Sequence, residues 1–268
     1  MKRVLVTGAT DGIGHETARQ LLAGGMHVLV HGRNEAKATS RANDLASHIT
    51  GAKVTPVWGD LSRMREVAVL ADQVRTAAPV LDVLVNNAGI YAHRRKLTED
   101  RFESTMAVNH FAPYLLTRLV GPLLSKSPAG RIITVSSMAH QSGDIDLDDL
   151  TFENGFDGYH AYATSKLANI LFTRALATRL SGTSVTANCL HPGVIDTKLL
   201  HAGFAMKGAP VEQGARTSVY LATSEDVAGI SGKYFDNCRA VTPSRKARDE
   251  QLAQALWNIS EQLLSAYF

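Results

Sequence analysis

Cysteines and metal-ligand patterns are scarce in this chain of 268 residues. Its two cysteines, Cys189 and Cys238, are too few for a disulfide framework and lack the spacing of a metal site. The ten histidines are scattered, and none forms a His-x-x-x-His pair on an expected helix. We therefore expect no disulfide framework and no bound metal ion.

Long apolar runs are also missing. No apolar stretch approaches the length of about 18 residues that a membrane-spanning helix needs. The first apolar run begins at residue 3, which leaves no room for a signal peptide. We therefore expect a cytoplasmic protein without an integral membrane segment.

Charge of one sign does not dominate, since the formal net charge is +3 and 20% of the residues are charged. The densest basic runs, residues 93–96 and 245–248, are short and have acidic neighbours. We interpret both as solvated surface and expect no nucleic-acid partner.

What the chain does contain is a regular alternation of short apolar runs and longer amphipathic segments. We expect strands at residues 3–7, 27–31, 53–58, 80–86, 130–136, 184–190 and 233–235. We expect helices at residues 12–23, 34–49, 64–77, 101–125, 159–180, 212–223 and 250–268. This order is typical of an α/β fold with a doubly wound parallel sheet of about seven strands and helices on both faces. Because no linker or repeat interrupts the pattern, residues 1–268 form a single expected domain.

Two segments depart from this alternation. Residues 138–158 are rich in Gly, Asp and Asn, and we interpret them as a loop inserted ahead of the helix at 159–180. Residues 196–211 follow a Pro-Gly turn and carry Leu199, Leu200, Phe204 and Met206, which suggests a mobile cover over a substrate pocket. The alternative for both segments is an ordinary surface loop.

A glycine-rich turn follows the first expected strand. It reads Thr7-Gly8-Ala9-Thr10-Asp11-Gly12-Ile13-Gly14. Its glycines allow a tight turn and a close approach of the backbone to a pyrophosphate, and the helix from residue 12 points its N-terminal amides at that phosphate. The position between a strand and a helix favours a dinucleotide site formed by Gly8, Thr10, Asp11, Gly12, Ile13 and Gly14.

The end of the second strand indicates which dinucleotide is bound. An acidic residue there usually holds the ribose 2′-hydroxyl of NAD, whereas an arginine accommodates the 2′-phosphate of NADP. This chain has Arg33 and Asn34 at that place and no acid, so we expect NADP(H). Asp11 stands where a second basic residue would strengthen this expectation.

Further polar and small residues follow the third and fourth strands, at the edge where open α/β sheets bind ligands. Asp60, followed by Leu61, is a candidate partner for the adenine amine. Asn87, Ala88 and Gly89 end the fourth strand, where small residues let the backbone lie against the cofactor.

Four residues form a candidate catalytic set. Tyr162 and Lys166 are four apart on one expected helix face, so the cation would favour phenolate and lower the pKa of the phenol. Ser137 ends the fifth strand and could polarise a substrate carbonyl, and Asn109 lies in an apolar helical segment, where water could link it to Lys166. Taken singly, the Tyr–Lys pair could be two unrelated helix residues and Ser137 could be a helix cap.

With these motifs in this order, the chain resembles the short-chain dehydrogenase/reductase family along essentially its whole length. The resemblance rests on Thr7–Gly14, Asn86–Gly89, Asn109, Ser137, Tyr162-x-x-x-Lys166 and Pro192-Gly193 followed by Thr197. It implies a single-domain Rossmann-type fold and a catalytic tetrad of Asn109, Ser137, Tyr162 and Lys166. It also implies that Pro192, Gly193, Ile195 and Thr197 lie at the cofactor, the last two against the nicotinamide carboxamide.

The interval from Ser137 to Tyr162 is 25 residues, about twice the usual family value. A similar insertion, preceded by Ser-Ser-x-Ala-His and followed by Ser-Lys-Leu-Ala-Asn-Ile-Leu-Phe, is a feature of retinol dehydrogenase-like members. Those relatives often carry a membrane anchor. Because no apolar run of this chain is long enough for one, we expect a soluble carbonyl reductase built on the same frame.

We thus expect an NADP(H)-dependent oxidoreductase that interconverts a carbonyl and an alcohol, with Tyr162 as the acid–base and a lipophilic or aromatic substrate. A non-catalytic NADP(H)-binding regulator or scaffold, and a sugar epimerase or dehydratase, are the alternatives. Apolar and Ala-rich faces on the helices at 101–125 and 159–180, including Ala168, Leu171, Phe172 and Ala175, predict a homodimer or homotetramer. The same faces could instead be intramolecular core.

Overall fold

A computed structural model describes residues 1–204 and 206–268 of the chain, and in these residues eight strands form one sheet. The strand order is β3-β2-β1-β4-β5-β6-β7-β8, with β1 to β7 parallel and β8 antiparallel to β7. The strands are β1 (Arg3–Val6), β2 (His27–Gly32), β3 (Lys53–Trp58), β4 (Val83–Asn86), β5 (Arg131–Val135), β6 (Thr186–His191), β7 (Tyr234–Asp236) and β8 (Arg239–Val241).

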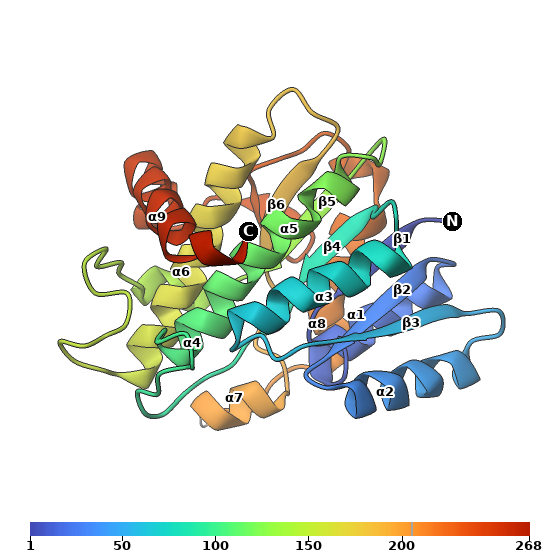
Figure 1. The fold of residues 1–268 in the computed structure, drawn as a ribbon, viewed down its shortest axis with the longest axis horizontal. Coiled ribbons are helices and arrows are strands. Elements are labelled where there is room, and N and C mark those ends of the chain that lie inside the picture. Colours follow the sequence, from blue (N-terminus) through green and yellow to red (C-terminus); the bar gives the residue numbers. More distant parts are fainter. Residues whose placement is uncertain (205) are drawn as a thin grey trace.

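Helices cover both faces of this sheet (Figure 1). They are α1 (Gly12–Ala23), α2 (Glu35–His48), α3 (Met64–Ala77), α4 (Ser104–Met106), α5 (Ala112–Leu124), α6 (Gly158–Arg179), α7 (Lys198–Gly203), α8 (Val211–Thr223) and α9 (Glu250–Leu263). The core on one face is built with α3, α5 and α6, and the core on the other with α1, α2 and α8. The expected single α/β domain with a doubly wound sheet is confirmed.

The strands are apolar on both sides because each side packs against helices. In β1, Leu5 belongs to the core under α3, α5 and α6, whereas Val4 and Val6 belong to the core under α1 and α8. Pro56 lies in β3, at one edge of the sheet, where a missing N–H does not interrupt a central ladder.

The eighth strand was not expected from the sequence. β8 has three exposed residues, Arg239–Val241, and pairs with β7 through a turn in which Asn237 and Cys238 have positive φ angles of 47° and 61°. Such a short, exposed segment lacks the apolar alternation that identifies a strand in a sequence.

The prediction of one continuous helix at 101–125 was wrong. The chain forms α4, then a π-helical turn at Ala107–Phe111, and only then α5. Residues 105–117 are all buried, so this stretch has no polar face whose change of phase would reveal the extra residue of the π-turn.

The two irregular segments contain short helices. The insertion at 138–158 begins with a 3₁₀ turn, Met138–Ser142, and the expected cover segment at 196–211 contains α7. Ala205 of that segment lies outside the described residues. Among the described residues, no helix combines the length and apolar character needed to cross a membrane.

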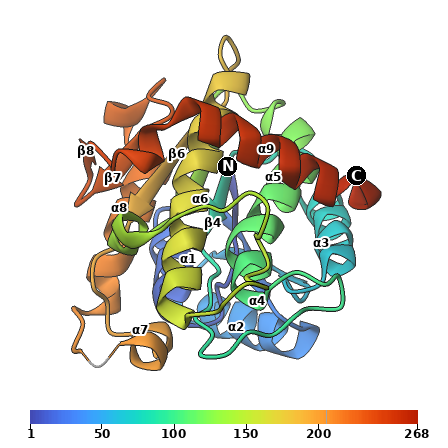
Figure 2. The same ribbon diagram turned by 90° about the vertical axis from the view of Figure 1, so that its left-hand side faces the viewer.

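The C-terminal helix α9 lies across α6 (Figure 2). Trp257 of α9 stacks on Phe172 of α6, with ring centroids 5.9 Å apart and planes at 17°. Ala168, Leu171 and Ala175, expected to pair with a second copy, are buried within this one chain. The face proposed for a two-fold contact is therefore intramolecular core, and self-association stays a prediction that needs another surface.

Candidate active site

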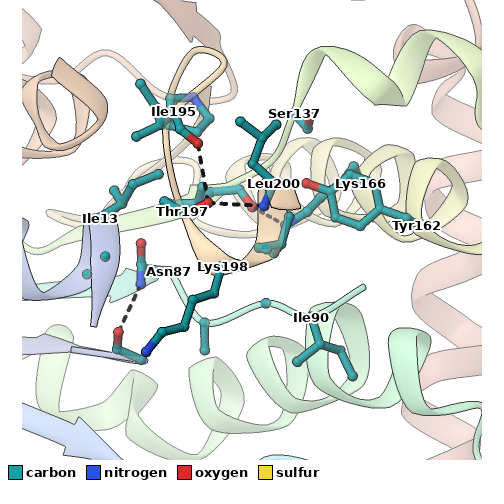
Figure 3. Close-up of a pocket in the computed structure, with 18 of the residues that line it drawn as sticks. Ile13, Asn87, Ile90, Ser137, Tyr162, Lys166, Ile195, Thr197, Lys198 and Leu200 are labelled. Carbon is teal, nitrogen blue, oxygen red and sulfur yellow. Dashed lines mark hydrogen bonds between the residues drawn. The ribbon is translucent and has the colours of Figure 1, made fainter. Parts of the chain in front are cut away.

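A pocket of about 810 Å³ opens at the carboxyl ends of the parallel strands. Figure 3 shows Tyr162 and Lys166 of α6 on one side, Ile13 and Asn87 on the other, with Thr197 between them. Nearly all of the predicted site residues line it: Gly8, Thr10, Asp11, Gly12, Ile13, Gly14, Arg33, Asp60, Leu61, Asn87, Ala88, Gly89, Ser137, Tyr162, Lys166, Pro192, Gly193, Ile195 and Thr197. Of the predicted residues, Asn34 and Asn109 are not part of this lining.

The glycine-rich turn is packed too tightly for side chains. Gly8 and Gly12 have φ angles of +63° and +53°, a region that favours glycine. A Cβ on Gly14 would lie 2.3 Å from the carbonyl oxygen of Gly8 and from Nδ2 of Asn87. The first-turn N–H groups of α1, which have no acceptor within the helix, are thereby held at the pocket, as pyrophosphate binding requires.

Thr7 ties this turn to the end of β4, a role that the sequence analysis missed. Its hydroxyl oxygen accepts the N–H groups of Asn87, at 2.9 Å, and Ala88, at 3.0 Å. Asn87 returns a hydrogen bond through Nδ2 to the Thr7 carbonyl oxygen at 2.8 Å. The two strands that flank the switch point of the sheet are thus joined by side chains as well as by their ladder.

His31 is a second residue that the sequence analysis missed. Its Nδ1 accepts the Gly8 N–H at 3.1 Å, and its Nε2 lies 3.0 Å from the carbonyl oxygen of Gly59, so Nε2 carries the hydrogen. Burial lowers the pKa of His31 to about 4. The neutral ring joins the ends of β1, β2 and β3 beneath the pocket.

The end of the pocket beside β2 and α2, where the adenosine of the expected cofactor would lie, is basic. Arg33 and Lys37 are both exposed there and line the pocket, and the sequence analysis named only the first. Arg41 lies behind them and donates from Nε to the Thr10 carbonyl oxygen at 3.2 Å. Asn34 instead caps α2 by accepting the Lys37 N–H at 3.0 Å.

Asp11 is engaged by other groups at the pocket mouth. Its side chain accepts the Gly12 N–H at 2.9 Å, which caps α1, and pairs with Nζ of Lys198 at 2.5 Å. The hydrogen bond from Lys198 is the main cause that lowers the pKa of Asp11. This ion pair joins α7 to the glycine-rich turn, while the negative charge of Asp11 is balanced by Lys198.

Asn109 lies in the π-helical turn and is fully buried. Its Oδ1 accepts the Ile90 N–H at 2.8 Å, and its Nδ2 donates to the Ile90 carbonyl at 3.0 Å and to Oγ of Ser165 at 3.0 Å. A Cβ on Gly89 would lie 3.4 Å from both Asn109 Oδ1 and Lys166 Nζ. Asn109 therefore lies beside Lys166, behind the pocket wall.

Tyr162 and Lys166 are buried side by side in α6. Nζ of Lys166 is 5.5 Å from the Tyr162 ring centroid and donates to the Val135 carbonyl oxygen at 3.1 Å. Burial raises the pKa of Tyr162 to about 12, although a hydrogen bond with Ser137 opposes the shift, and burial lowers the pKa of Lys166 to about 8. The expected lowering of the phenol pKa is not found in this structure, because burial raises the pKa more than the hydrogen bond with Ser137 lowers it.

Ser137 combines the two roles considered for it. It begins the 3₁₀ turn, and its Oγ accepts the Ala139 N–H at 3.2 Å, while it also lines the pocket. The neighbouring Ser136 points into the protein and donates to the Lys166 carbonyl oxygen at 2.7 Å. One serine therefore faces the pocket and the other anchors α6 to β5.

An aromatic group closes the far end of the pocket. Phe204, just after α7, packs on Tyr91, Tyr159 and Tyr162 with ring centroids 5.7 to 6.1 Å apart. Gly203 permits this contact, because a Cβ there would lie 2.7 Å from the Tyr91 ring. Tyr91 was missed in the sequence analysis, since it stands in an irregular segment without a pattern.

The family model for short chain dehydrogenases matches residues 2–208. The chain belongs to this family. Human retinol dehydrogenase 14 (Homo sapiens) is 42% identical to it over 287 residues, covering 97% of this chain and 85% of the human protein. The resemblance of this short-chain dehydrogenase to the retinol dehydrogenases, inferred from the insertion before Tyr162, is confirmed.

Solved structures agree with the family assignment. An uncharacterised protein from Mycobacterium paratuberculosis has a TM-score of 0.84 and 35% identity, covering 99% of this short-chain dehydrogenase and 94% of that chain. A protein from Beutenbergia cavernae, provisionally assigned as an NAD(P) dependent gluconate 5-dehydrogenase, has a TM-score of 0.73 and 29% identity, covering 88% and 94%. That structure contains NADP at low occupancy.

Proposed function

We propose that this short-chain dehydrogenase is an NADP(H)-dependent oxidoreductase that interconverts a carbonyl and an alcohol. The observation that carries the proposal is the meeting of the Ser137 hydroxyl, the Tyr162 phenol and the Lys166 side chain at a pocket that begins at the glycine-rich turn. Donors of hydrogen bonds and protons gathered at one point are what the developing alkoxide of a carbonyl reduction needs.

A nicotinamide dinucleotide would supply a hydride ion to the carbonyl carbon. Ser137 donates a hydrogen bond to the carbonyl oxygen, because its Oγ accepts the Ala139 N–H and its hydrogen can turn from the Tyr162 phenol to the substrate. Tyr162 transfers its phenolic proton to the same oxygen, and the raised pKa keeps that proton in place until the oxygen becomes basic. Lys166 stabilises the phenolate that remains, and Asn109 fixes the wall beside it.

A preference for NADP(H) is supported by Arg33 and Lys37, which both line the pocket after β2, whereas the nearby Glu35 does not line it. Two cations can neutralise the 2′-phosphate dianion of NADP, whereas the 2′-hydroxyl of NAD carries no charge for them to neutralise. The NADP in the Beutenbergia cavernae structure is consistent with a cofactor of the NAD(P) type.

A lipophilic or aromatic substrate is supported by the lining of the far end of the pocket. Phe204, Leu199, Leu200 and Met206 come from the expected cover segment, and Tyr159 and Met138 face them from the other side. The name of human retinol dehydrogenase 14 points to the same class, an alcohol on an apolar body.

The decisive experiment measures NADPH consumption with a panel of lipophilic aldehydes and ketones, for the wild type and for Tyr162→Phe. We expect kcat to fall by a factor of about 10² to 10⁴ in Tyr162→Phe, because general acid catalysis contributes that much. The dissociation constant for NADPH should change little, since the ring remains.

Tyr220→Phe is the control, because it removes a phenol from α8 that does not line the pocket. We expect it to retain kcat within about threefold. Wild-type turnover in Tyr162→Phe would sink the assignment of Tyr162. Tight NADPH binding without turnover on any substrate would favour the alternative of a non-catalytic NADP(H)-binding regulator.

A further inference from the structure

His140 follows Ser137 by three residues and is buried, with 1% of its surface exposed. Its Nδ1 lies 2.7 Å from the carbonyl oxygen of Ser137. On the other side of the ring, the backbone N–H of Ser244 points at Nε2 from 3.2 Å. The ring also packs edge-on against Tyr234, with centroids 5.0 Å apart.

These two partners determine the protonation of the ring. A carbonyl oxygen can only accept a hydrogen bond, so Nδ1 must carry a hydrogen. A backbone N–H can only donate, so Nε2 must be unprotonated. His140 satisfies both partners only as the neutral Nδ1–H tautomer, which is the opposite of the tautomer required at His31.

The peptide groups around Ser137 are fixed from several directions. The Ser137 carbonyl accepts both the His140 ring N–H and the His140 backbone N–H, the latter at 3.2 Å. The Met138 N–H donates to Nδ1 of His191 at 3.3 Å, and the Ala139 N–H donates to Ser137 Oγ. These contacts hold the Ser137 backbone in place, and because Oγ accepts the Ala139 N–H, the hydroxyl hydrogen points away from Ala139.

The far side of the ring belongs to the segment that leads into α9. Ser244 begins that segment, and Lys246 two residues later pairs with Asp144 at 2.8 Å, on the chain just after the 3₁₀ turn. The segment before α9 and the turn that carries Ser137 are thus joined at two points, one of them through the imidazole.

We propose that His140 is the positioning residue for Ser137, which it holds through the hydrogen bond from Nδ1 to the Ser137 carbonyl while Ser244 orients the ring. This rests on the proposed function, because the effect is expressed in carbonyl reduction. The hydrogen bond from Ser137 strengthens as charge develops on the substrate oxygen, so a displaced hydroxyl lowers kcat more than it raises KM.

Two substitutions separate positioning from packing. In His140→Asn the amide nitrogen stands near the place of Nδ1 and can donate to the Ser137 carbonyl, but the side chain is too short to reach Ser244. In His140→Gln the amide is one carbon further out and can accept from Ser244, but it cannot also serve Ser137. The glutamine is closer in volume to histidine, so a role in packing alone predicts that it is the milder change.

The proposal predicts the reverse order. We expect kcat of His140→Gln to fall about tenfold or more, and kcat of His140→Asn to stay within about threefold of the wild type, with the KM for the carbonyl substrate and NADPH binding little changed in both. Ser244→Ala, which keeps the backbone N–H, should match the wild type. Equal kcat values for the Asn and Gln variants, or a smaller loss in Gln, would overturn the proposal.

A second measurement does not depend on turnover or on the folding of variants. Long-range ¹H–¹⁵N correlation spectra of the wild type labelled with ¹⁵N-histidine distinguish the two neutral tautomers, and His140→Gln identifies the signal that disappears. We expect the Nδ1–H tautomer for His140, and an Nε2–H or charged ring would overturn the proposal. A wild type that shows this tautomer but reduces no carbonyl would contradict the proposed function while leaving the ring geometry intact.

Discussion

At the scale of single residues, the pocket holds ionisable groups in forms that water would not favour. Tyr162 is 6% exposed and Lys166 is 3% exposed. Burial raises the pKa of Tyr162 and lowers that of Lys166, which favours the neutral form of each. Burial of a charge lowers stability unless partners compensate for it. Within the described residues, Nζ of Lys166 donates a hydrogen bond only to the carbonyl oxygen of Val135.

Lys166→Met should therefore stabilise the protein while it abolishes turnover. The folded pKa of about 8 lies below the unfolded value of 10.5, so the unfolded chain binds more protons between these pH values. The unfolding free energy of the wild type should therefore rise with pH across this window. Below pH 8 the buried Lys166 charge lowers the unfolding free energy by its full amount, on the order of 3 kcal/mol.

Urea unfolding at pH 7 and pH 10 measures this difference between wild type and Lys166→Met. The exposed Lys126 provides the control, since Lys126→Met should leave the pH profile parallel to that of the wild type. A Lys166→Met variant that is less stable than the wild type at pH 7 would contradict the explanation.

Arg33 is the residue at which cofactor preference can be tested. Arg33→Ala should raise the dissociation constant for NADPH about tenfold and leave that for NADH nearly unchanged, because only the 2′-phosphate requires the cation. Fluorescence titration measures both constants, and Arg239→Ala on β8 is an exposed control away from the pocket. Equal losses for the two cofactors would assign Arg33 a role other than phosphate recognition.

At the scale of elements, the glycine-rich turn works through contacts with a distant strand end. The Cβ position of Gly14 is occupied by the Gly8 carbonyl and by Asn87, which Thr7 holds in place. A substitution there must displace the Gly8 backbone as well as the hydrogen-bonded Asn87 side chain.

Gly14→Ala should lower the free energy of unfolding by about 1–3 kcal/mol, the usual range for overpacking, and weaken NADPH binding at the same time. Gly121→Ala is the matched control, because nothing lies within 4 Å of its Cβ position in α5. We expect Gly121→Ala to stabilise by about 0.5–1 kcal/mol, since alanine suits a helix better than glycine. Thermal or urea unfolding measures the change in both variants. A Gly14→Ala variant as stable as Gly121→Ala would show that the turn is loosely packed.

At the scale of the whole molecule, α9 completes the core over α6. Trp257 stacks on Phe172, packs edge-on against Tyr114, and carries the Arg179 guanidinium 3.9 Å from its ring centroid. The last helix therefore belongs to the body of the domain, and it covers the apolar face of α6.

Trp257→Ala should cost about 3–5 kcal/mol of stability, as is typical when a large buried aromatic side chain is removed. We also expect greater self-association of this variant, because the face of α6 becomes exposed. Urea unfolding and light scattering measure the two effects, with the exposed Phe268→Ala as a control near the same end of the chain. A variant as stable and as dispersed as the control would show that α9 contributes little.

Light scattering of the wild type tests the predicted homodimer or homotetramer.

The sequence by itself determined the order of β1 to β7 and of the main helices, the strand ends that form the site, and most of the residues at the pocket. Gly14, Tyr162 and Lys166 stand at fixed distances along single elements, and local spacing is enough to place them. The bounds of α1 and α3 were predicted to the residue, because apolar periodicity is a local property.

Only the tertiary structure decided which distant groups meet. Thr7 with Asn87, His31 with Gly59, and His140 with Ser244 join residues that are 80, 28 and 104 positions apart. Nor could spacing show that burial would raise the pKa of Tyr162, or that α9 would cover α6. Such hydrogen bonds, exposures and coverings depend on how complete elements pack, and a pattern of neighbouring residues carries no record of that packing.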